Sequence, residues 1–325
     1  TGSAIQLMFL DKILDKLSLD NLGVLFIHGL NPYGFKYQRK VTENNVDLNR
    51  NCTTNPELYE SKNPGYAKMS SLLIPQSTVS IEKLQYRFFH LNAIYKIIKE
   101  SLPVLRQAAL QGQYEFENGI YYGGRKPEPQ IKDLESLLGG IIKDYRTILN
   151  VDLHTGYGQR NKLHLFLNPV EDKIVLDSLQ YIFKDEEIDW GNTQDFYTIN
   201  GEYLEWINQL AGNSLCIPMR FEYGTLDSHT LMGSLNSIQI MISENQGAHF
   251  GFRDQKSEEK VKIDFREMYY PSSHEWRSKI LRDSFEMMSR MMERFQEFER
   301  HERIVIESNA NASVFGQFLP NKLKS

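Results

Sequence analysis

The sequence predicts an α/β fold: a doubly wound, mixed β-sheet with helices on both faces. Short apolar runs of the kind that parallel sheets bury occur at residues 22–27, 147–153 and 216–222. Longer segments with apolar residues at helical spacing lie between these runs. Polar residues follow each run directly, and open α/β sheets bind ligands at the carboxyl ends of their strands.

The N-terminal part begins with a predicted helix. Residues 4–18 carry apolar positions at helical spacing, and Ser3 is a suitable N-cap. Residues 22–27 then predict a short, fully buried strand. The turn Asn31-Pro32-Tyr33-Gly34 follows it. Helix, short loop and buried strand in this order are typical of a doubly wound sheet.

The middle of the chain alternates loops with helices. A polar stretch from residue 52 to 80, rich in Asn, Pro, Gly and Ser, predicts a long loop or insertion. Residues 87–110 have a strong helical pattern that is broken only at Pro103. The turn-rich residues 112–129 separate that helix from a second amphipathic helix at 131–144.

The C-terminal half supplies further strands and long helices. The run 147–153 ends at His154, and the run 216–222 ends at Glu222. The methionines of the last helix are expected in the core, with its charges facing solvent. The other expected elements, in order, are a strand at 162–167, a mixed region with a short helix at 170–215, and helices at 229–245 and 273–303.

Length and charge limit the class of protein. The 325 residues suit one α/β domain with insertions, which we place at residues 1–308, followed by a tail at 309–325. A hydrophobic share of 41% is enough for a sizeable core. The net charge of −5 gives no basic footprint, so a nucleic-acid partner is not favoured.

The cysteines and the N-terminal sequence are informative about the cellular compartment. Cys52 and Cys216 make no disulfide framework, which favours a reducing compartment. No apolar run is long enough for a transmembrane helix, and no signal-peptide pattern is visible. We therefore expect a cytoplasmic protein without a membrane partner. The chain starts at Thr1 without an initiator Met, so this expectation leaves open what precedes Thr1.

His154 is the first candidate for chemistry, because it lies directly after a buried strand. It can be a hydrogen-bonded histidine at a strand end, which is the more common role for a lone His. It can also be a metal ligand or a general base at the edge of the sheet. Asp152, two residues earlier, points to the same side of the strand and could orient the imidazole.

Glu222 ends another apolar strand. A carboxylate there is either a surface residue just past the strand or a partly buried acid whose pKa is raised. The second alternative suits a general base that acts on a metal-bound water. The sequence alone weighs the two about equally.

Arg39, Asn49 and Arg50 are considered together. Arginine's planar guanidinium grips carboxylates with two hydrogen bonds. Any single arginine is better explained by a structural ion pair, here with Asp47 or Glu43. Here that explanation is weaker, because the Asn49-Arg50 pair and a second arginine, Arg39, all lie close in sequence to the Asn31-Pro32 turn.

Several self-contained sites are excluded by spacing. None of the eight histidines starts a His-x-x-Glu pair, and no His-Glu-x-x-His motif occurs. A nucleophile elbow, a Walker loop and a dinucleotide-binding glycine fingerprint are also absent from the sequence.

Together these residues carry a resemblance. The turn 31–35, Arg39 and the block Asp47-Leu48-Asn49-Arg50-Asn51 are followed by strands that end in His154 and Glu222. This order resembles the zinc carboxypeptidase superfamily, the funnelins, and most of all a bacterial branch of unknown function. The resemblance spans residues 1 to about 250. It implies a zinc carboxypeptidase-like fold.

The resemblance also implies roles. Arg39 would stabilise the oxyanion, and Asn49 with Arg50 would bind the free carboxylate of the substrate. His154 would ligate zinc, and Glu222 would be the general base. A tyrosine that some members add lies in the interval of Tyr197 and Tyr203. The sequence does not choose between the two, and Tyr197 is taken as the candidate substrate-binding residue.

The sequence departs from the family pattern in one respect. The family's other two zinc ligands belong to a His-x-x-Glu motif, and the start Thr1-Gly2-Ser3 resembles the residues just after it. Either the motif lies upstream of Thr1 and the protein is a zinc enzyme, or the protein is metal-free. We favour the zinc enzyme, because Glu222, Arg39, Asn49 and Arg50 occur together.

The function expected from the resemblance is metallocarboxypeptidase-like hydrolysis of an amide bond next to a free carboxylate, with a peptide as substrate. One alternative is an N-acyl amino acid deacylase of the aspartoacylase type. Another is a metal-free pseudoenzyme that binds peptide C-termini. Side-chain preference and oligomeric state are left open.

Overall fold

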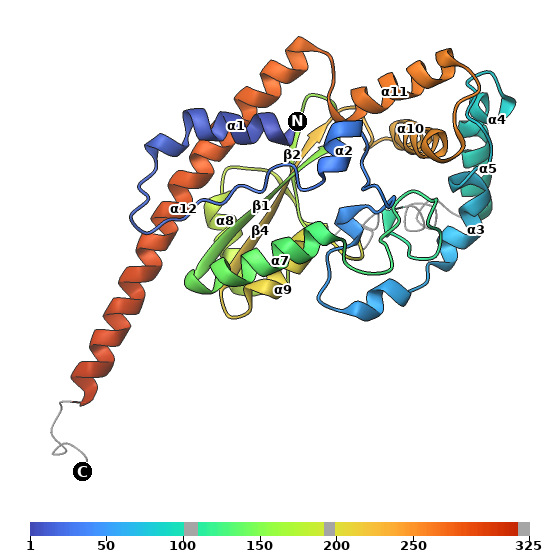
Figure 1. Cartoon of the computed structure of the whole chain (residues 1–325). Helices are drawn as coiled ribbons and strands as arrows, with labels where there is room; N and C mark the ends of the chain where they lie inside the picture. The colour runs from blue at the N-terminus through green and yellow to red at the C-terminus, as the bar shows by residue number, and fades with distance from the viewer. Residues whose placement is uncertain (101–109, 192–198, 318–325) are drawn as a thin grey trace.

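The computed structural model describes residues 1–100, 110–191 and 199–317, with side chains described up to residue 300 except that of residue 100 (Figure 1). Its centre is a four-stranded mixed sheet in the order β1-β4-β2-β3. The strands are β1 (Thr147–Gly156), β2 (Leu163–Phe166), β3 (Ile188–Asp189) and β4 (Leu215–Gly224). The α/β class and the mixed sheet are thus confirmed.

The register of the two long strands sets the geometry of the site. β1 and β4 are parallel and pair over their whole length, from Thr147 opposite Leu215 to Gly156 opposite Gly224. His154 therefore lies directly opposite Glu222. β2 runs antiparallel to β4 on its other side, and β3 is parallel to β2. Because β1 and β4 are parallel, their carboxyl ends meet at one edge of the sheet.

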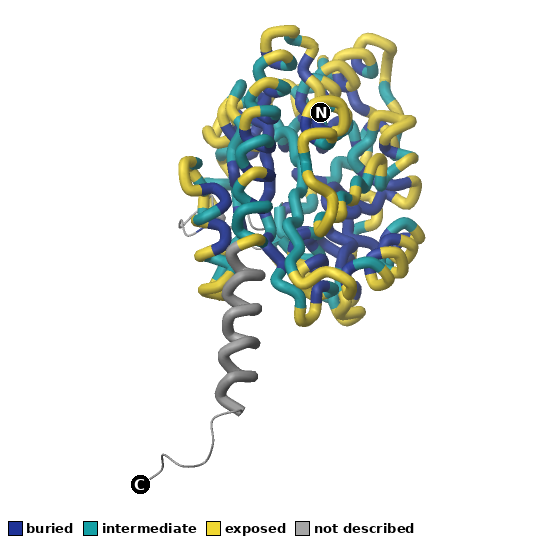
Figure 2. Tube along the Cα trace, turned by 90° about the vertical axis from the view of Figure 1, so that its left-hand side faces the viewer, coloured by how far each residue is buried: buried dark blue, intermediate teal, exposed yellow. Residues whose placement is uncertain are grey.

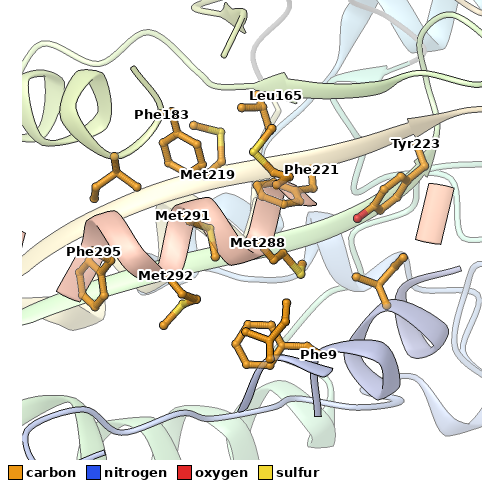
Figure 3. Close-up of a cluster of buried hydrophobic side chains, with 14 of the residues drawn as sticks. Phe9, Leu165, Phe183, Met219, Phe221, Tyr223, Met288, Met291, Met292 and Phe295 are labelled. Atoms are coloured by element: carbon orange, nitrogen blue, oxygen red, sulfur yellow. The ribbon is translucent and has the colours of Figure 1, made fainter. Parts of the chain in front are cut away.

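One face of the sheet is covered by three helices. They are α1 (Gly2–Lys12), α8 (Lys173–Ile182) and α12 (His274–Gln317). Met219 and Phe221 of β4 pack there against Met288, Met291 and Phe295 of α12, as Figure 3 shows. These methionines are buried, so the prediction that they belong to the core is confirmed.

The opposite face is covered by α7 (Pro129–Ile141) and α9 (Tyr203–Ala211). Cys216 of β4 packs there with Trp206, Leu134 and Leu138, in a cluster separate from the first. The odd-numbered β4 residues from 215 to 223 pack into the first cluster and Cys216 into the second, as the two-residue period of a strand requires. The prediction of helices on both faces is confirmed.

A helical region adjoins the site end of the sheet (Figure 1). Its members pack around their own cluster, which includes Tyr66, Leu235 and Phe265. Figure 2 shows exposed segments on the outside of the molecule and buried ones in its interior. The helices there are α3 (Pro64–Leu73), α4 (Leu84–Arg87), α5 (Phe89–Glu100), α10 (Leu231–Phe250) and α11 (Gln255–Tyr269). No helix in the described residues combines the length and apolar character needed to span a bilayer.

The remaining elements are short. Helix α2 (Pro32–Tyr37) starts at Asn31, whose side-chain oxygen accepts a hydrogen bond from the N–H of Gly34. The 3₁₀ turns are η1 (Leu14–Lys16), η2 (Leu48–Arg50), η3 (Pro56–Glu60) and η4 (Ile142–Asp144). Turn η2 holds the Asn49-Arg50 pair, and Asp47 caps it by accepting from the N–H of Asn49.

Four element predictions need correction. Residues 22–27 form no strand and are only partly buried, because within the described residues no strand lies beside them. The expected loop at 52–80 contains η3 and α3, which an Asn-Pro pair starts in each case. Helix α11 was not predicted. Helix α12 continues to Gln317, past the expected end at 303.

Candidate functional site

His154, Asp152 and Glu222 meet at the carboxyl edge of the sheet. Asp152 and His154 are two residues apart on β1 and therefore share a face, and β4 places Glu222 opposite His154. His154 Nε2 lies 2.6 Å from Asp152 Oδ2. His154 Nδ1 lies 3.6 Å from Glu222 Oε2. The imidazole is thus held between two carboxylates, one at each ring nitrogen.

Asp152 fixes the orientation of this imidazole. Burial by itself would raise the pKa of Asp152, but the charge and hydrogen bond of His154 outweigh burial and hold that pKa below its ordinary value. Nε2–H donates to the ionised Asp152, and Nδ1 faces Glu222. A carboxylate that orients a histidine in this way is typical of metal-ligating histidines.

Glu222 is the more buried carboxylate of the two, with 8% of its side chain exposed. Burial raises its pKa, against the opposing influence of His154 and of the Tyr157 main-chain N–H. That N–H donates to Glu222 Oε1 over 3.0 Å and fixes the position of the carboxylate. A buried carboxylate with a raised pKa is suited to accept and return a proton.

A buried ion pair lies next to Asp152, and the sequence analysis did not predict it. Arg220 of β4 lies opposite Asp152 and forms an ion pair with Glu202, which precedes α9. Both side chains are almost fully buried. Arg220 also lies over the Phe166 ring, 5.2 Å from its centroid. The two-residue spacing of Arg220 and Glu222 on one strand was the available signal for this residue.

Lys40 is the second group that sequence reasoning missed. Its ammonium pairs with the buried carboxylate of Asp47 and lies 4.7 Å from the centroid of the Tyr121 ring. Burial lowers the pKa of Lys40, while Asp47 and Glu222 act in the opposite direction. Lys40, Asp152 and His154 line the same cavity. A lysine directly after Arg39 was visible in the sequence, but only the fold shows which of the two cations points to the cavity.

Arg39 is directed elsewhere. Its Nε donates to Glu244 of α10 over 2.8 Å, and one terminal nitrogen donates to Asn245 over 3.2 Å. None of the contacts found for Arg39 in the described residues is with His154 or Glu222. Arg39 thus makes a structural ion pair, but with Glu244 and not with the Asp47 or Glu43 considered from the sequence.

Asn49 and Arg50 are close to the site and are engaged by the protein itself. Asn49 lines the cavity, and its side-chain oxygen accepts from the N–H of Tyr203 over 2.9 Å. Arg50 is 4% exposed. Its Nε and one terminal nitrogen donate to the Leu110 carbonyl, and the other donates to the Asn49 carbonyl. Binding of a substrate carboxylate would use the N–H groups that remain.

Of the two candidate tyrosines, the structure describes Tyr203. Tyr197 lies outside the described residues. Tyr203 begins α9 and lines the cavity beside Asn49. Burial raises the pKa of the Tyr203 hydroxyl well above its ordinary value, so this hydroxyl stays protonated at neutral pH.

Of the described residues, His154 could hold a metal ion through Nδ1, because Nε2 is engaged by its hydrogen bond with Asp152. Among the described residues, no group of three His, Cys, Asp or Glu side chains is arranged to hold a metal ion. Burial raises the pKa of the Cys216 thiol to about 12, so this thiol is neutral and is a poor ligand.

Comparison with known proteins gives a family. The family model described as "Protein of unknown function (DUF2817)" matches residues 1–283. No curated protein and no solved structure matches the chain.

Proposed function

The chain belongs to the DUF2817 family, and we propose that it is a zinc-dependent, metallocarboxypeptidase-like hydrolase with a zinc carboxypeptidase-like fold. It would cleave an amide bond next to a free carboxylate in a peptide. One observation carries the proposal: Asp152 orients His154 so that Nδ1 faces the buried carboxylate of Glu222. An oriented imidazole beside a buried base is the combination that metal-assisted hydrolysis needs.

The zinc would be held in part by His154 Nδ1. When bound, zinc supplies a water of lowered pKa and polarises the scissile carbonyl. The resemblance of the motifs around Asn49, His154 and Glu222 to the carboxypeptidase pattern implies a His-x-x-Glu pair for the other two ligands, and residues 1–325 contain no such pair.

Glu222 is the proposed general base. It takes a proton from the attacking water and delivers it to the leaving amine. Its raised pKa favours this exchange, because a carboxylate with an ordinary pKa holds a proton too weakly at neutral pH. The Tyr157 N–H fixes one carboxylate oxygen and leaves the other, Oε2, facing His154.

The oxyanion role that the sequence suggested for Arg39 fits Lys40 better. Lys40 lines the cavity with His154, and Glu222 acts on its charge. Arg39 pairs with Glu244 of α10. A buried ammonium can stabilise the negative charge that develops on the carbonyl oxygen. Burial lowers the pKa of Lys40, and the pairing with Asp47 opposes this shift.

Asn49 and Arg50 are proposed to hold the substrate carboxylate. A guanidinium binds a carboxylate with two hydrogen bonds. Arg50 spends one N–H on the Asn49 carbonyl and two on the Leu110 carbonyl. The two N–H groups that these bonds leave would bind the substrate carboxylate.

Metal and substrate assays on the protein made from its complete gene test the proposal. We expect bound zinc by metal analysis and cleavage of N-blocked dipeptides with a free carboxylate, but not of their amides. Cleavage of N-acyl amino acids without cleavage of peptides would instead identify a deacylase. Binding of peptide C-termini without zinc and without cleavage would identify a pseudoenzyme.

A further inference from the structure

The ring of Tyr121 contacts both cations of the proposed site. Lys40 Nζ lies over this ring, 4.7 Å from its centroid, and Arg50 Cζ lies over it at 5.0 Å. A cation within about 6 Å of the centroid is attracted by the negative face of the ring, and more strongly where water is excluded. Tyr121 is buried, with 8% of its surface exposed. One side chain thus attracts both the proposed oxyanion cation and the cation proposed to hold the substrate carboxylate.

The backbone of Tyr121 has a conformation that tyrosine rarely adopts. Its φ is 55°, in the left-handed region, which is unfavourable for a bulky side chain. Glycine or asparagine adopts this region at lower cost. What tyrosine adds at this position is its ring. Residues held in unfavourable backbone conformations cluster at functional sites, so the backbone indicates a role for the ring itself.

Hydrogen bonds from other segments hold the main chain around Tyr121 in place. Each carbonyl from residue 120 to residue 123 accepts one. The donors are, in order, the Tyr66 hydroxyl, the Gln113 N–H, the Asp47 N–H and the side-chain amide of Asn51. Asp47 and Asn51 lie on either side of the Asn49-Arg50 pair. The loop that carries the ring is therefore fastened to the segment that carries Arg50.

The hydroxyl end of the ring is fixed by α10. Tyr121 Oη donates to Met241 Sδ over 3.3 Å. The two cations belong to separate turns, since Lys40 follows α2 and Arg50 is in η2. They also repel each other, because both are positively charged. A ring that attracts both cations and is itself fixed can keep their separation constant.

We propose that Tyr121 is a positioning residue that sets the distance between Lys40 and Arg50. A substrate then binds productively only when its carboxylate reaches Arg50 while its scissile carbonyl lies beside Lys40. The site thus measures how many atoms separate the carboxylate from the amide, and it selects a carboxylate on the α-carbon. This selection rests on the proposed function, whereas the arrangement of the two cations does not.

The arrangement of the cations can be measured without turnover. NMR relaxation of the Arg50 Nε–H and of the Lys40 ammonium gives an order parameter for each side chain. Both should stay at wild-type values in Tyr121→Phe, which keeps the ring. Tyr121→Leu and Tyr121→Asn remove the ring, and asparagine also suits the left-handed backbone. In these two variants at least one order parameter should fall towards about 0.6, the value of a flexible group.

Tyr122→Leu is the matched control, because Tyr122 is buried in the same loop and its hydroxyl is hydrogen-bonded to Arg125. It removes the same ring as Tyr121→Leu from the neighbouring position. The order parameters of Lys40 and Arg50 should keep their wild-type values in it. Unchanged order parameters after removal of the Tyr121 ring would overturn the inference. An equal fall in Tyr122→Leu would overturn it too, because the whole loop would then position the cations.

Selection by the site is tested with two peptides that differ by one CH₂. One ends in alanine and the other in β-alanine, which moves the carboxylate one carbon further from the amide. We expect kcat/KM to favour alanine in the wild type, in Tyr121→Phe and in Tyr122→Leu. This preference should fall at least about tenfold when the Tyr121 ring is removed.

The ratio for the two peptides separates positioning from a structural defect, since a defect lowers both rates equally. A ratio that is unchanged without the Tyr121 ring, or a wild type without the preference, would overturn the role in selection. Absence of turnover with both peptides in the wild type would instead contradict the proposed function. The order parameters would then still decide whether Tyr121 positions the two cations.

Discussion

At the scale of single residues, the site follows from the two-residue period of two paired strands. Asp152 and His154 share one face of β1, and Arg220 and Glu222 share the same face of β4. The parallel register then places Asp152 opposite Arg220 and His154 opposite Glu222. This pairing gives one imidazole two carboxylate neighbours.

Replacing the proposed base tests this arrangement directly. Glu222→Gln keeps the size of the side chain and its contact with Tyr157, but it removes the proton acceptor. We expect turnover to fall by about 10²- to 10⁴-fold, which is the usual contribution of a general base. Zinc content, measured on the same sample, should be unchanged. Glu187→Gln, an exposed change, is the matched control and should leave turnover unaltered. Wild-type turnover in Glu222→Gln would remove Glu222 from the mechanism.

The neighbouring cations Arg39 and Lys40 should have different roles, one in stability and the other in turnover. Lys40→Met should lower kcat, because Lys40 lines the cavity with His154. Arg39→Met should mainly lower stability, by about 1–3 kcal/mol, because it leaves the Glu244 carboxylate without its donor. Steady-state kinetics and urea unfolding of both variants measure the two effects. A large loss of kcat in Arg39→Met, with little in Lys40→Met, would restore the oxyanion role to Arg39.

At the scale of elements, apolar runs predict strands well where the fold provides neighbours. The runs at 147–153 and 216–222 became β1 and β4, which pair with each other. The equally apolar run at 22–27 did not, because its edges meet a cavity instead of another strand. A strand is defined by its hydrogen-bond partners, and no local pattern contains them.

Two helices were missed although a capping residue marks the start of each, while the cap expected at Ser3 is wrong, since Thr1 is the N-cap of α1. Asn63-Pro64 starts α3 and Asp254 starts α11, each with a side-chain oxygen that accepts from the first turn. The stretch 52–80 was predicted as a loop from its composition, and no element was predicted at 246–272. The same capping rule would have found both helices.

The junction between α9 and β4 depends on the buried pair of Glu202 and Arg220. Glu202→Gln leaves the Arg220 charge buried and without its partner, which should cost about 3–5 kcal/mol of unfolding free energy. Chemical denaturation measures the loss. Glu205→Gln is the matched control on the same helix, because Glu205 is exposed, and its effect should stay within about 0.5 kcal/mol. Equal losses in the two variants would show that the ion pair does not hold this junction.

At the scale of the whole molecule, the sequence motifs predicted which segments come together but not where their side chains point. The turn 31–35, the block 47–51 and the two strand ends all reach one region, as the resemblance implied. Arg39 and Lys40 are adjacent, so the direction of each depends on how α10 packs against their loop. The guanidinium of Arg50 is oriented by its hydrogen bond to the carbonyl of Leu110, which is 60 residues away in the sequence. Such choices are made by tertiary packing.

The stability of the molecule in acid should depend on Asp47. Burial alone would raise its pKa, but Lys40 and Arg50 outweigh burial and hold it below the ordinary value of 3.8. A carboxylate with a lowered pKa in the folded state stabilises that state at pH values above its unfolded pKa. This contribution is lost as the pH falls through the folded pKa. We therefore expect the unfolding free energy of the wild type to decline as the pH drops below 3.8.

Asp47→Asn isolates this contribution. At neutral pH the variant leaves the partly buried Lys40 without its carboxylate and should lose about 1–3 kcal/mol of unfolding free energy. The gap to the wild type should narrow in acid, because protonation of Asp47 removes the same charge. The double variant Lys40→Met/Asp47→Asn should recover part of the loss, since no unpaired charge remains. Glu43→Gln, an exposed change in the same loop, is the control. A gap that stays constant from neutral pH to below 3.8 would show that Asp47 is not the carboxylate behind the acid sensitivity.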